Sequence, residues 1–290
     1  MFTVSLIAAP GRLDPELAAS LRNAWGGGEL VWLSPDEAAE FEIKTRSAHE
    51  DEIWQSLQAS SVDLAVQRSE SRRKRILIAD MDSTMIQQEC IDELAAEAGV
   101  GERVAAITAR AMNGELDFEE ALRERVGLLA GLPVTVIDKV LAERITLMPG
   151  GPELVATMRS SGAYTALVSG GFTSFTGPIA DRLGFHENRA NTLLETDGAL
   201  TGMPGDPILG REAKVIALKE IADRLGITPA DAIAVGDGAN DLGMLQLAGT
   251  GVALHAKPSV QAEARIRINH ADLTSLLFLQ GYSRDEFISG

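Results

Sequence analysis

The chain has 290 residues, of which 45% are hydrophobic, and its formal net charge is −16. This length is ample for two domains with a sizeable core. The negative charge argues against a protein that holds nucleic acid through a phosphate-neutralising surface. The basic run at 72–75 is therefore interpreted as a solvated linker or strand entry, with RNA binding as the alternative.

Cysteine content and hydropathy indicate where the protein works. The single cysteine, Cys90, excludes an intrachain disulfide framework and suits a reducing compartment. It falls in an apolar-rich pattern, which favours a packed thiol over a nucleophile. The N-terminal residues lack the basic region of a signal peptide, and no segment is long enough to span a bilayer. We expect a cytoplasmic protein without membrane contact.

Residues 1–70 predict a small α+β module. A strand-like segment, a helix, a glycine-rich turn, a second strand and a later helix follow one another at 2–9, 14–25, 26–29, 30–33 and 50–60. No acid pair, histidine cluster or phosphate loop occurs there. The polar stretch 67–75 then reads as a linker.

From residue 76 short apolar strands alternate with helices. The expected strands are 76–80, 164–171, 232–238 and 249–254, and the expected helices between or after them are 153–160, 211–225 and 242–248. This alternation predicts an α/β domain, 71–290, whose parallel sheet is covered by helices on both faces and connected by right-handed crossovers.

One long segment interrupts the alternation. Between 91 and 145 apolar residues recur at helical spacing, as in Phe118, Leu122 and Val126. Asp117 followed by Glu120 resembles a helix-capping box. We predict an α-helical cap inserted at about 90–148.

Chemistry-bearing residues follow the predicted strands, where ligands bind in open α/β sheets. Asp80 and Asp82 follow the first strand, Ser169 closes another, and the sequence GDGAND occupies 236–241 after a third. Two like charges about 4 Å apart repel by about 4 kcal/mol at an effective dielectric near 20. Four carboxylates at one edge therefore require a cation, and ligands that are all oxygen favour Mg²⁺.

The remaining groups at this edge suit a phosphate. The hydroxyl of Ser169 and the backbone N–H groups of Gly170 and Gly171 can cradle anionic oxygens, and Lys214 can neutralise them. Nucleotide-binding glycine motifs are absent from the sequence. An aspartate can attack phosphorus directly and form an aspartyl-phosphate.

The segments DMDST, SGG, Lys214 and GDGAND, in this order, resemble the four motifs of the haloacid dehalogenase (HAD) superfamily of phosphohydrolases, over a region from about residue 75 to the C-terminus. The resemblance implies a Rossmann-like HAD core with a helical cap, preceded here by a module that is compatible with a reduced ACT-like region. It also implies that Asp80 is the nucleophile, and that Asp82 protonates the leaving group and then activates water.

The resemblance further implies two sets of binding residues. The implied Mg²⁺ ligands are Asp80, the backbone carbonyl of Asp82, Asp237 and, as a further ligand or supporting acid, Asp241. The implied phosphate-binding residues are Ser169, Gly170 and Lys214, with Asn240 close by.

Within the superfamily the cap is similar to that of the phosphoserine phosphatases. In this comparison Glu89 would hold the substrate ammonium and Arg125 its carboxylate, while Met112 and Phe118 would help exclude water. The implied reaction is hydrolysis of O-phosphoserine to serine and phosphate, the last step of serine biosynthesis.

Other interpretations stay open at this point. Each motif alone could be a loop or a strand exit, and Met112 and Phe118 could belong to the core. The phosphoryl group could pass to another alcohol such as homoserine, or the substrate could be another small phosphoester such as phosphothreonine. The N-terminal module could instead make the chain a sensor of amino acids or a partner-binding protein, including a homo-oligomer.

Overall fold

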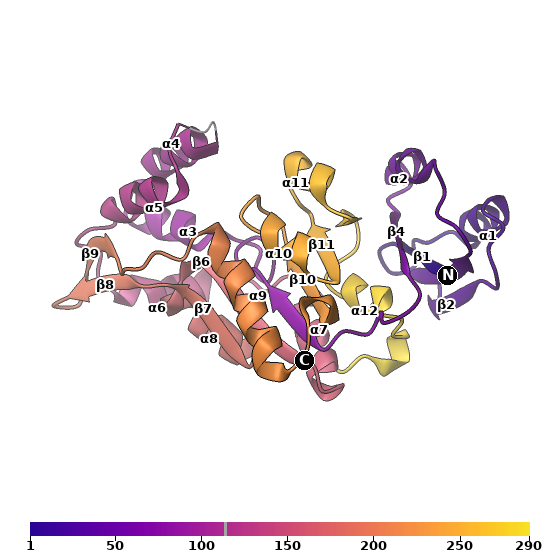
Figure 1. The fold of residues 1–290 in the computed structure, drawn as a ribbon. Coiled ribbons are helices and arrows are strands. Elements are labelled where there is room, and N and C mark those ends of the chain that lie inside the picture. Colours follow the sequence, from indigo (N-terminus) through magenta and orange to yellow (C-terminus); the bar gives the residue numbers. More distant parts are fainter. Residues whose placement is uncertain (113–114) are drawn as a thin grey trace.

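The computed structural model describes residues 1–112 and 115–290 (Figure 1). A parallel sheet with helices on both faces forms the centre, a mostly helical lobe projects from one side, and the N-terminal module lies on the other. No helix among the described residues combines the length and the apolar character that crossing a membrane requires.

The N-terminal module is an antiparallel sheet of four strands in the order β2-β3-β1-β4. The strands are β1 (Phe2–Ile7), β2 (Val31–Ser34), β3 (Ala38–Ile43) and β4 (Asp63–Arg68), and the helices are α1 (Pro15–Ala24) and α2 (Glu50–Gln58). The side chain of Asp14 caps α1 by accepting from the N–H of Glu16.

The predicted linker at 67–75 begins too early. Strand β4 continues to Arg68, which pairs with Phe2, and Gln67 pairs with Thr3. These polar residues resemble a linker in the sequence, but their backbone groups complete the ladder with β1. Strand β3 was also missing from the expected elements.

The central sheet has six strands, and its pairings are all parallel, as predicted. In sheet order the strands are β12 (Ile266–Ile268), β11 (Thr250–Leu254), β10 (Ala232–Gly236), β5 (Ile76–Ala79), β6 (Tyr164–Phe172) and β7 (Glu187–Asn191). Every residue of β5 and β10 is buried. Burial on both faces explains the continuous apolar runs of these strands.

Alternate residues of β5 face two different cores, because successive side chains in a strand point to opposite faces. Leu77 and Ala79 pack with α7 (Gly151–Ser160), α8 (Thr173–Leu183) and α12 (Ser275–Leu279). On the other face Ile76 and Ile78 pack with α9, α10 and α11, which span Arg211–Leu225, Leu242–Leu247 and Pro258–Glu263. Because helices cover both faces, a ligand would reach the sheet at the carboxyl ends of its strands.

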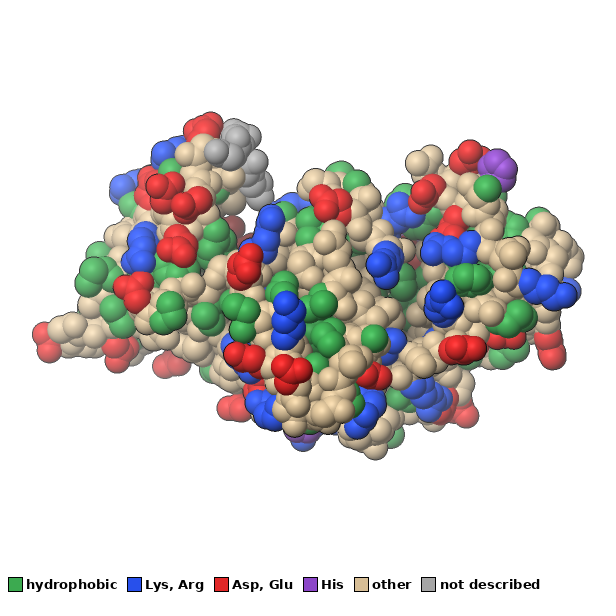
Figure 2. Space-filling model, in the orientation of Figure 1, with side chains coloured by type: hydrophobic (Ala, Val, Ile, Leu, Met, Phe, Trp, Pro, Cys, Tyr) green, Lys and Arg blue, Asp and Glu red, His purple; other side chains and the backbone are tan. Residues whose placement is uncertain are grey.

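The inserted lobe consists of α3 (Cys90–Glu97), α4 (Gly101–Met112), α5 (Phe118–Gly127) and α6 (Thr135–Glu143). The capping box of Asp117 and Glu120 is present at the start of α5. A hairpin that the sequence did not reveal, β8 (Leu193–Thr196) and β9 (Ala199–Pro204), packs against α5. The chain enters and leaves the lobe side by side, where Ile86 bridges Leu147. Figure 2 shows a recess between the part that carries α4 and the part that carries α11.

A fully buried carboxylate, that of Asp63, helps to join the N-terminal module to the central domain. Asp63 accepts hydrogen bonds from three consecutive backbone N–H groups, those of Asn269 (2.8 Å), His270 (3.0 Å) and Ala271 (2.9 Å). Ile7, Ala38 and Ala65 of the module share a hydrophobic core with the parallel sheet. The two sheets are therefore packed together and not merely tethered.

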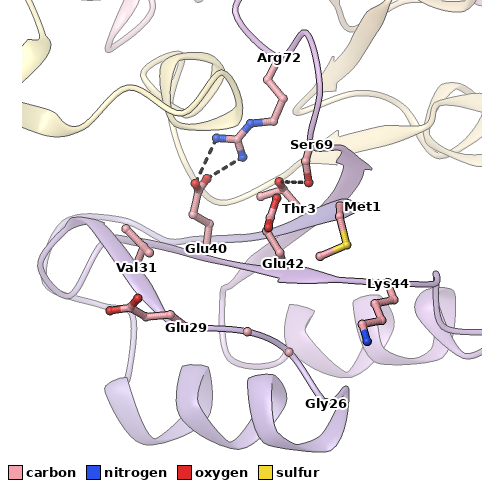
Figure 3. Close-up of a pocket in the computed structure, with 12 residues that line it drawn as sticks. Met1, Thr3, Gly26, Glu29, Val31, Glu40, Glu42, Lys44, Ser69 and Arg72 are labelled. Carbon is pink, nitrogen blue, oxygen red and sulfur yellow. Dashed lines mark hydrogen bonds and ion pairs between the residues drawn. The ribbon is translucent and has the colours of Figure 1, made fainter.

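A cavity of about 500 Å³ lies in the N-terminal module (Figure 3). Its walls include Thr3, Glu42 and the glycine turn 26–28, and Arg72 closes one side through two hydrogen bonds to Glu40, of 2.7 and 3.1 Å. None of the residues that line it belongs to the four motifs, so the candidate chemistry lies elsewhere.

Replacing Asp63 by Asn should destabilise the protein. Asparagine offers one acceptor oxygen to three N–H donors and turns its own N–H₂ toward them, at a cost of about 2 kcal/mol or more. Urea unfolding measures the loss. The matched control is Asp51→Asn, because the exposed Asp51 also crosses this junction, to Arg267, and its removal should change the unfolding free energy by less than about 0.5 kcal/mol. Equal effects of the two substitutions would contradict the assigned role.

Candidate active site

Three neighbouring strands bring the motif residues together. In the parallel sheet β5 lies between β10 and β6, so their carboxyl ends meet at one edge. Asp80 follows β5, Asp237 follows β10, and Ser169 lies near the end of β6. The N–H of Asp80 donates to the carbonyl of Val235 at 3.0 Å and fixes the first two loops to each other.

Lys214 lies between two of the acids. Its ammonium is 2.7 Å from Oδ1 of Asp80 and 2.5 Å from Oδ1 of Asp241, and only 2% of the residue is exposed. Burial lowers the pKa of Lys214, but the carboxylates of Asp241 and Asp80 outweigh it and raise the pKa above its usual value. The lysine therefore keeps its charge. Helical spacing places it on the buried stripe of α9 with Ala217 and Leu218.

Asp80, Asp237 and Asp241 form a cluster that fits a divalent cation. Each offers a carboxylate oxygen, and these oxygens lie within 4.8 Å of one another. Three carboxylates and the ammonium of Lys214 sum to a formal charge of −2, which one Mg²⁺ would balance. Burial and the charge of Asp241 raise the pKa of Asp237 to about 6 and hold that of Asp80 well above its ordinary range. A bound cation would relieve the repulsion between these carboxylates, which contributes to both pKa shifts.

Short-range contacts hold this cluster in place. The hydroxyl of Thr84 donates to Oδ1 of Asp237 (3.2 Å), and the N–H of Gly238 donates to Oδ2 of Asp241 (2.9 Å). A Cβ on Gly236 would overlap the carboxyl group of Asp241. Glycine at 236 is thus required by packing. The half-buried Asn240 lies in the same turn.

Both carboxylate oxygens of Asp82 accept hydrogen bonds. Its Oδ1 accepts from the N–H of Cys90 (2.8 Å) and its Oδ2 from the hydroxyl of Ser169 (3.2 Å). Burial raises the pKa of Asp82, and the hydrogen bonds from Cys90 and Ser169 offset part of that rise. A carboxyl with a raised pKa can hold a proton for a leaving group. Cys90 itself is a buried thiol, as expected.

Two cap residues stand beside the motif loops. The ring of Phe118 lies against Gly170: a Cβ added to this glycine would lie 3.2 Å from the ring. Glu89 begins α3 and accepts from the hydroxyl of Ser83 at 2.7 Å. Part of its side chain is exposed, yet burial by the surrounding protein and then the charge of Asp82 raise its pKa to about 7.

Arg125 is half-buried on α5, where its Nε donates to the carbonyl of Ala121 at 3.1 Å. Among the described residues no carboxylate forms an ion pair with it. Burial lowers the pKa of Arg125, and the nearby charges of Asp92 and Glu89 raise it. The side chain of Met112, the remaining predicted cap residue, lies outside what the structure describes.

Three further residues near this site were not predicted from the sequence. Thr84 was overlooked as a support for Asp237, although it ends the DMDST motif. Asp92 contributes negative charge next to Arg125. Lys257 follows the next strand, β11, and its N–H approaches the carbonyl of Asp237 at 3.4 Å. Burial and Asp241 raise the pKa of Asp237, and the ammonium of Lys257 partly counteracts them.

Comparisons with known proteins agree with this geometry. The phosphoserine phosphatase of Streptomyces coelicolor is 44% identical over 79% of this chain and 56% of its own length, and that of a Polaromonas strain is 48% identical over 71% and 89%. The crystal structure of a HAD-family hydrolase from Salmonella enterica serovar Typhi matches with a TM-score of 0.88 and 30% identity, over 99% of this chain and all of that one.

The chain spans about half to two thirds of the length of the first curated relatives that it matches. The family model described as haloacid dehalogenase-like hydrolase covers residues 77–246, from the start of β5 to α10. That range contains Asp80, the inserted helical lobe, Ser169, Lys214 and the turn 236–241. The chain therefore belongs to the haloacid dehalogenase-like hydrolase family.

Proposed function

We propose that the protein hydrolyses O-phospho-L-serine to L-serine and phosphate through an aspartyl-phosphate on Asp80. One observation carries the proposal. The charge of Asp82 acts on Glu89, and the charges of Glu89 and Asp82 act on Arg125, a guanidinium without an ion pair among the described residues, so an acid and a base of the cap lie near the motif residues at the sheet edge. The names of the curated relatives support this substrate.

In the first step a carboxylate oxygen of Asp80 attacks phosphorus, and the bond between phosphorus and the serine oxygen breaks. Asp82 gives its proton to that oxygen, so that serine leaves as a neutral alcohol. Lys214, Ser169 and the N–H groups of the phosphate loop hold the phosphoryl oxygens.

In the second step water attacks the phosphorus of the aspartyl-phosphate. Asp82, now ionised, takes a proton from the water, and the carboxylate of Asp80 leaves. The residues that would hold Mg²⁺ are Asp80, Asp237 and Asp241, together with the backbone carbonyl of Asp82. When bound, the ion would supply positive charge to the transferring phosphoryl group.

The cap supplies the choice of substrate. Glu89 would pair with the ammonium of phosphoserine and Arg125 with its carboxylate, in a two-pronged contact that lysine could not form. The contact of Phe118 with Gly170 would keep bulk water from the phosphoryl group while serine is still bound.

Replacing Asp80 by Asn should lower phosphate release from phosphoserine at least about a thousand-fold, because the amide is not a nucleophile. Chelation of Mg²⁺ should abolish phosphate release by the parent enzyme, and added Mg²⁺ should restore that activity. The control Asp138→Asn alters an exposed acid of α6 and should leave turnover unchanged. Robust release by a folded Asp80→Asn protein would refute the nucleophile assignment.

Replacing Arg125 by Ala should raise KM for phosphoserine about 10- to 100-fold, since a charge-assisted contact to the substrate carboxylate is lost. O-Phosphoethanolamine keeps the ammonium but lacks the carboxylate, so its KM should change little. The control is Arg123→Ala, an exposed arginine of the same helix that pairs with Asp206. Equal increases for both substrates would exclude a contact between Arg125 and the carboxylate.

Replacing Glu89 by Gln should weaken catalysis in a pH-dependent way. The raised pKa of about 7 means that Glu89 is charged above that pH and neutral, like glutamine, below it. The kcat/KM of the parent divided by that of the variant should therefore be large at pH 8 and fall by up to about tenfold by pH 6, as the ionised fraction of Glu89 falls. With 3-phosphooxypropanoate, which lacks the ammonium, the ratio should stay flat. A flat ratio for phosphoserine as well would remove Glu89 from ammonium binding.

A further inference from the structure

Asn191, the last residue of β7, is a buried polar side chain outside the four motifs, with 2% of its surface exposed. Its Nδ2 donates to the carbonyl of Gly170 (2.8 Å) and to that of Leu209 (3.4 Å), and its Oδ1 accepts from the N–H of Leu209 (2.6 Å). One carboxamide therefore satisfies backbone groups from two separate loops.

These loops carry the two halves of the phosphate site. The pairing of β6 with β7 shifts register between Val168 and Phe172, so the ladder is interrupted where Ser169 and Gly170 lie. The interruption frees the backbone of this loop for a ligand but would leave the partly buried carbonyl of Gly170 without a strand partner. The carboxamide of Asn191 takes the place of that partner.

The peptide that links Gly170 to Gly171 is thereby held at both ends. Its carbonyl oxygen accepts from Asn191, and its N–H donates to the hydroxyl oxygen of Ser169 at 2.8 Å. The same hydroxyl donates to Asp82. The orientation of Ser169 thus depends on a peptide plane that Asn191 fixes.

The second loop leads to the lysine. Leu209 is followed by Gly210, the N-cap of α9, and Lys214 lies in the first turns of that helix. Because both backbone groups of Leu209 bind the carboxamide, the start of α9 is tied to the same point as Gly170.

We propose that Asn191 is a positioning residue of the phosphate site, which sets Ser169 and the phosphate loop against the helix that carries Lys214. The inference rests on the proposed phosphatase function for its kinetic readout only. Binding of inorganic phosphate reports on the same positioning without any turnover.

Substitution by aspartate gives this role a distinctive signature. Aspartate has the same shape, and its oxygen can still accept from Leu209. When ionised, however, it turns a negative oxygen toward the carbonyls of Gly170 and Leu209, and burial among them raises its pKa. When protonated, its O–H can donate to Gly170 in place of the amide. The variant should therefore recover as the pH falls.

The experiment compares Asn191→Asp with Asn188→Asp, on the same strand, from pH 5.5 to 8. Among the described residues the Asn188 side chain makes one hydrogen bond, which it accepts from the hydroxyl of Thr176 (2.8 Å), and aspartate keeps that role. The measurements are kcat/KM for phosphoserine and the inhibition or binding constant of inorganic phosphate, each divided by the value for the parent. Dividing by the parent value removes the titration of ionisable groups that variant and parent share. On the surrounding elements these groups are Asp82, His186, Arg189, Arg211 and Glu212.

At pH 8 we expect Asn191→Asp to lose at least 10-fold in kcat/KM and in phosphate affinity, and to regain at least threefold relative to the parent by pH 5.5. Asn188→Asp should stay near the parent throughout. A pH-independent ratio for Asn191→Asp, or unchanged phosphate affinity, would overturn the positioning role.

Asn191→Ser provides a second test that does not depend on the folding of the aspartate variant. Serine cannot reach both loops, so phosphate binding should weaken at every pH without recovery, and parent-like binding would contradict the proposal. If the parent bound phosphate but did not turn over phosphoserine, the proposed substrate would fail, while these binding results would still decide the role of Asn191.

Discussion

The ion pairs of the buried Lys214 with Asp80 and Asp241 are the constraint on which the site depends. Carboxylates withdrawn from water at one sheet edge repel one another, and a single ammonium, 2.7 and 2.5 Å from two of them, offsets only part of that repulsion. Burial, together with the remaining charge, raises the pKa of Asp237, and the same remaining charge makes the cluster suitable for Mg²⁺. A site held together in this way favours occupation by a cation.

Sheet topology turns this electrostatic requirement into a catalytic arrangement. Because β5 lies between β10 and β6, Asp80 shares one edge with the turn 236–241 on one side and with Ser169 on the other. Under the proposed function, this core would transfer a phosphoryl group whatever the rest of the ester. Selectivity would then come from the cap, where Glu89 and Arg125 carry charges opposite to those of an amino acid. Chemistry and selectivity are therefore carried by separate elements.

The sequence predicts those parts of the molecule in which local pattern and tertiary environment agree. Ile76–Ala79 reads as a buried strand because both of its faces are covered, and the acids that follow it signal the site. The end of strand β4 was not predicted, because Gln67 and Arg68 are polar. Only their pairing with β1 identifies them as part of a strand. Asn191 and Lys257 carry no local signal, since their partners lie in loops far away in the sequence. Met112 stays a prediction, because its side chain lies outside the described residues.

The junction with the N-terminal module extends the same reasoning beyond the site. Asp63 holds the N–H groups of 269–271, and two residues later the N–H of Leu273 donates to the carbonyl of Pro149 at 3.1 Å. Pro149 follows the segment by which the chain returns from the cap, where the N–H of Met148 donates to the carbonyl of Met85 at 2.9 Å. The module is thus hydrogen-bonded, through one loop, to the fixed end of the cap connection.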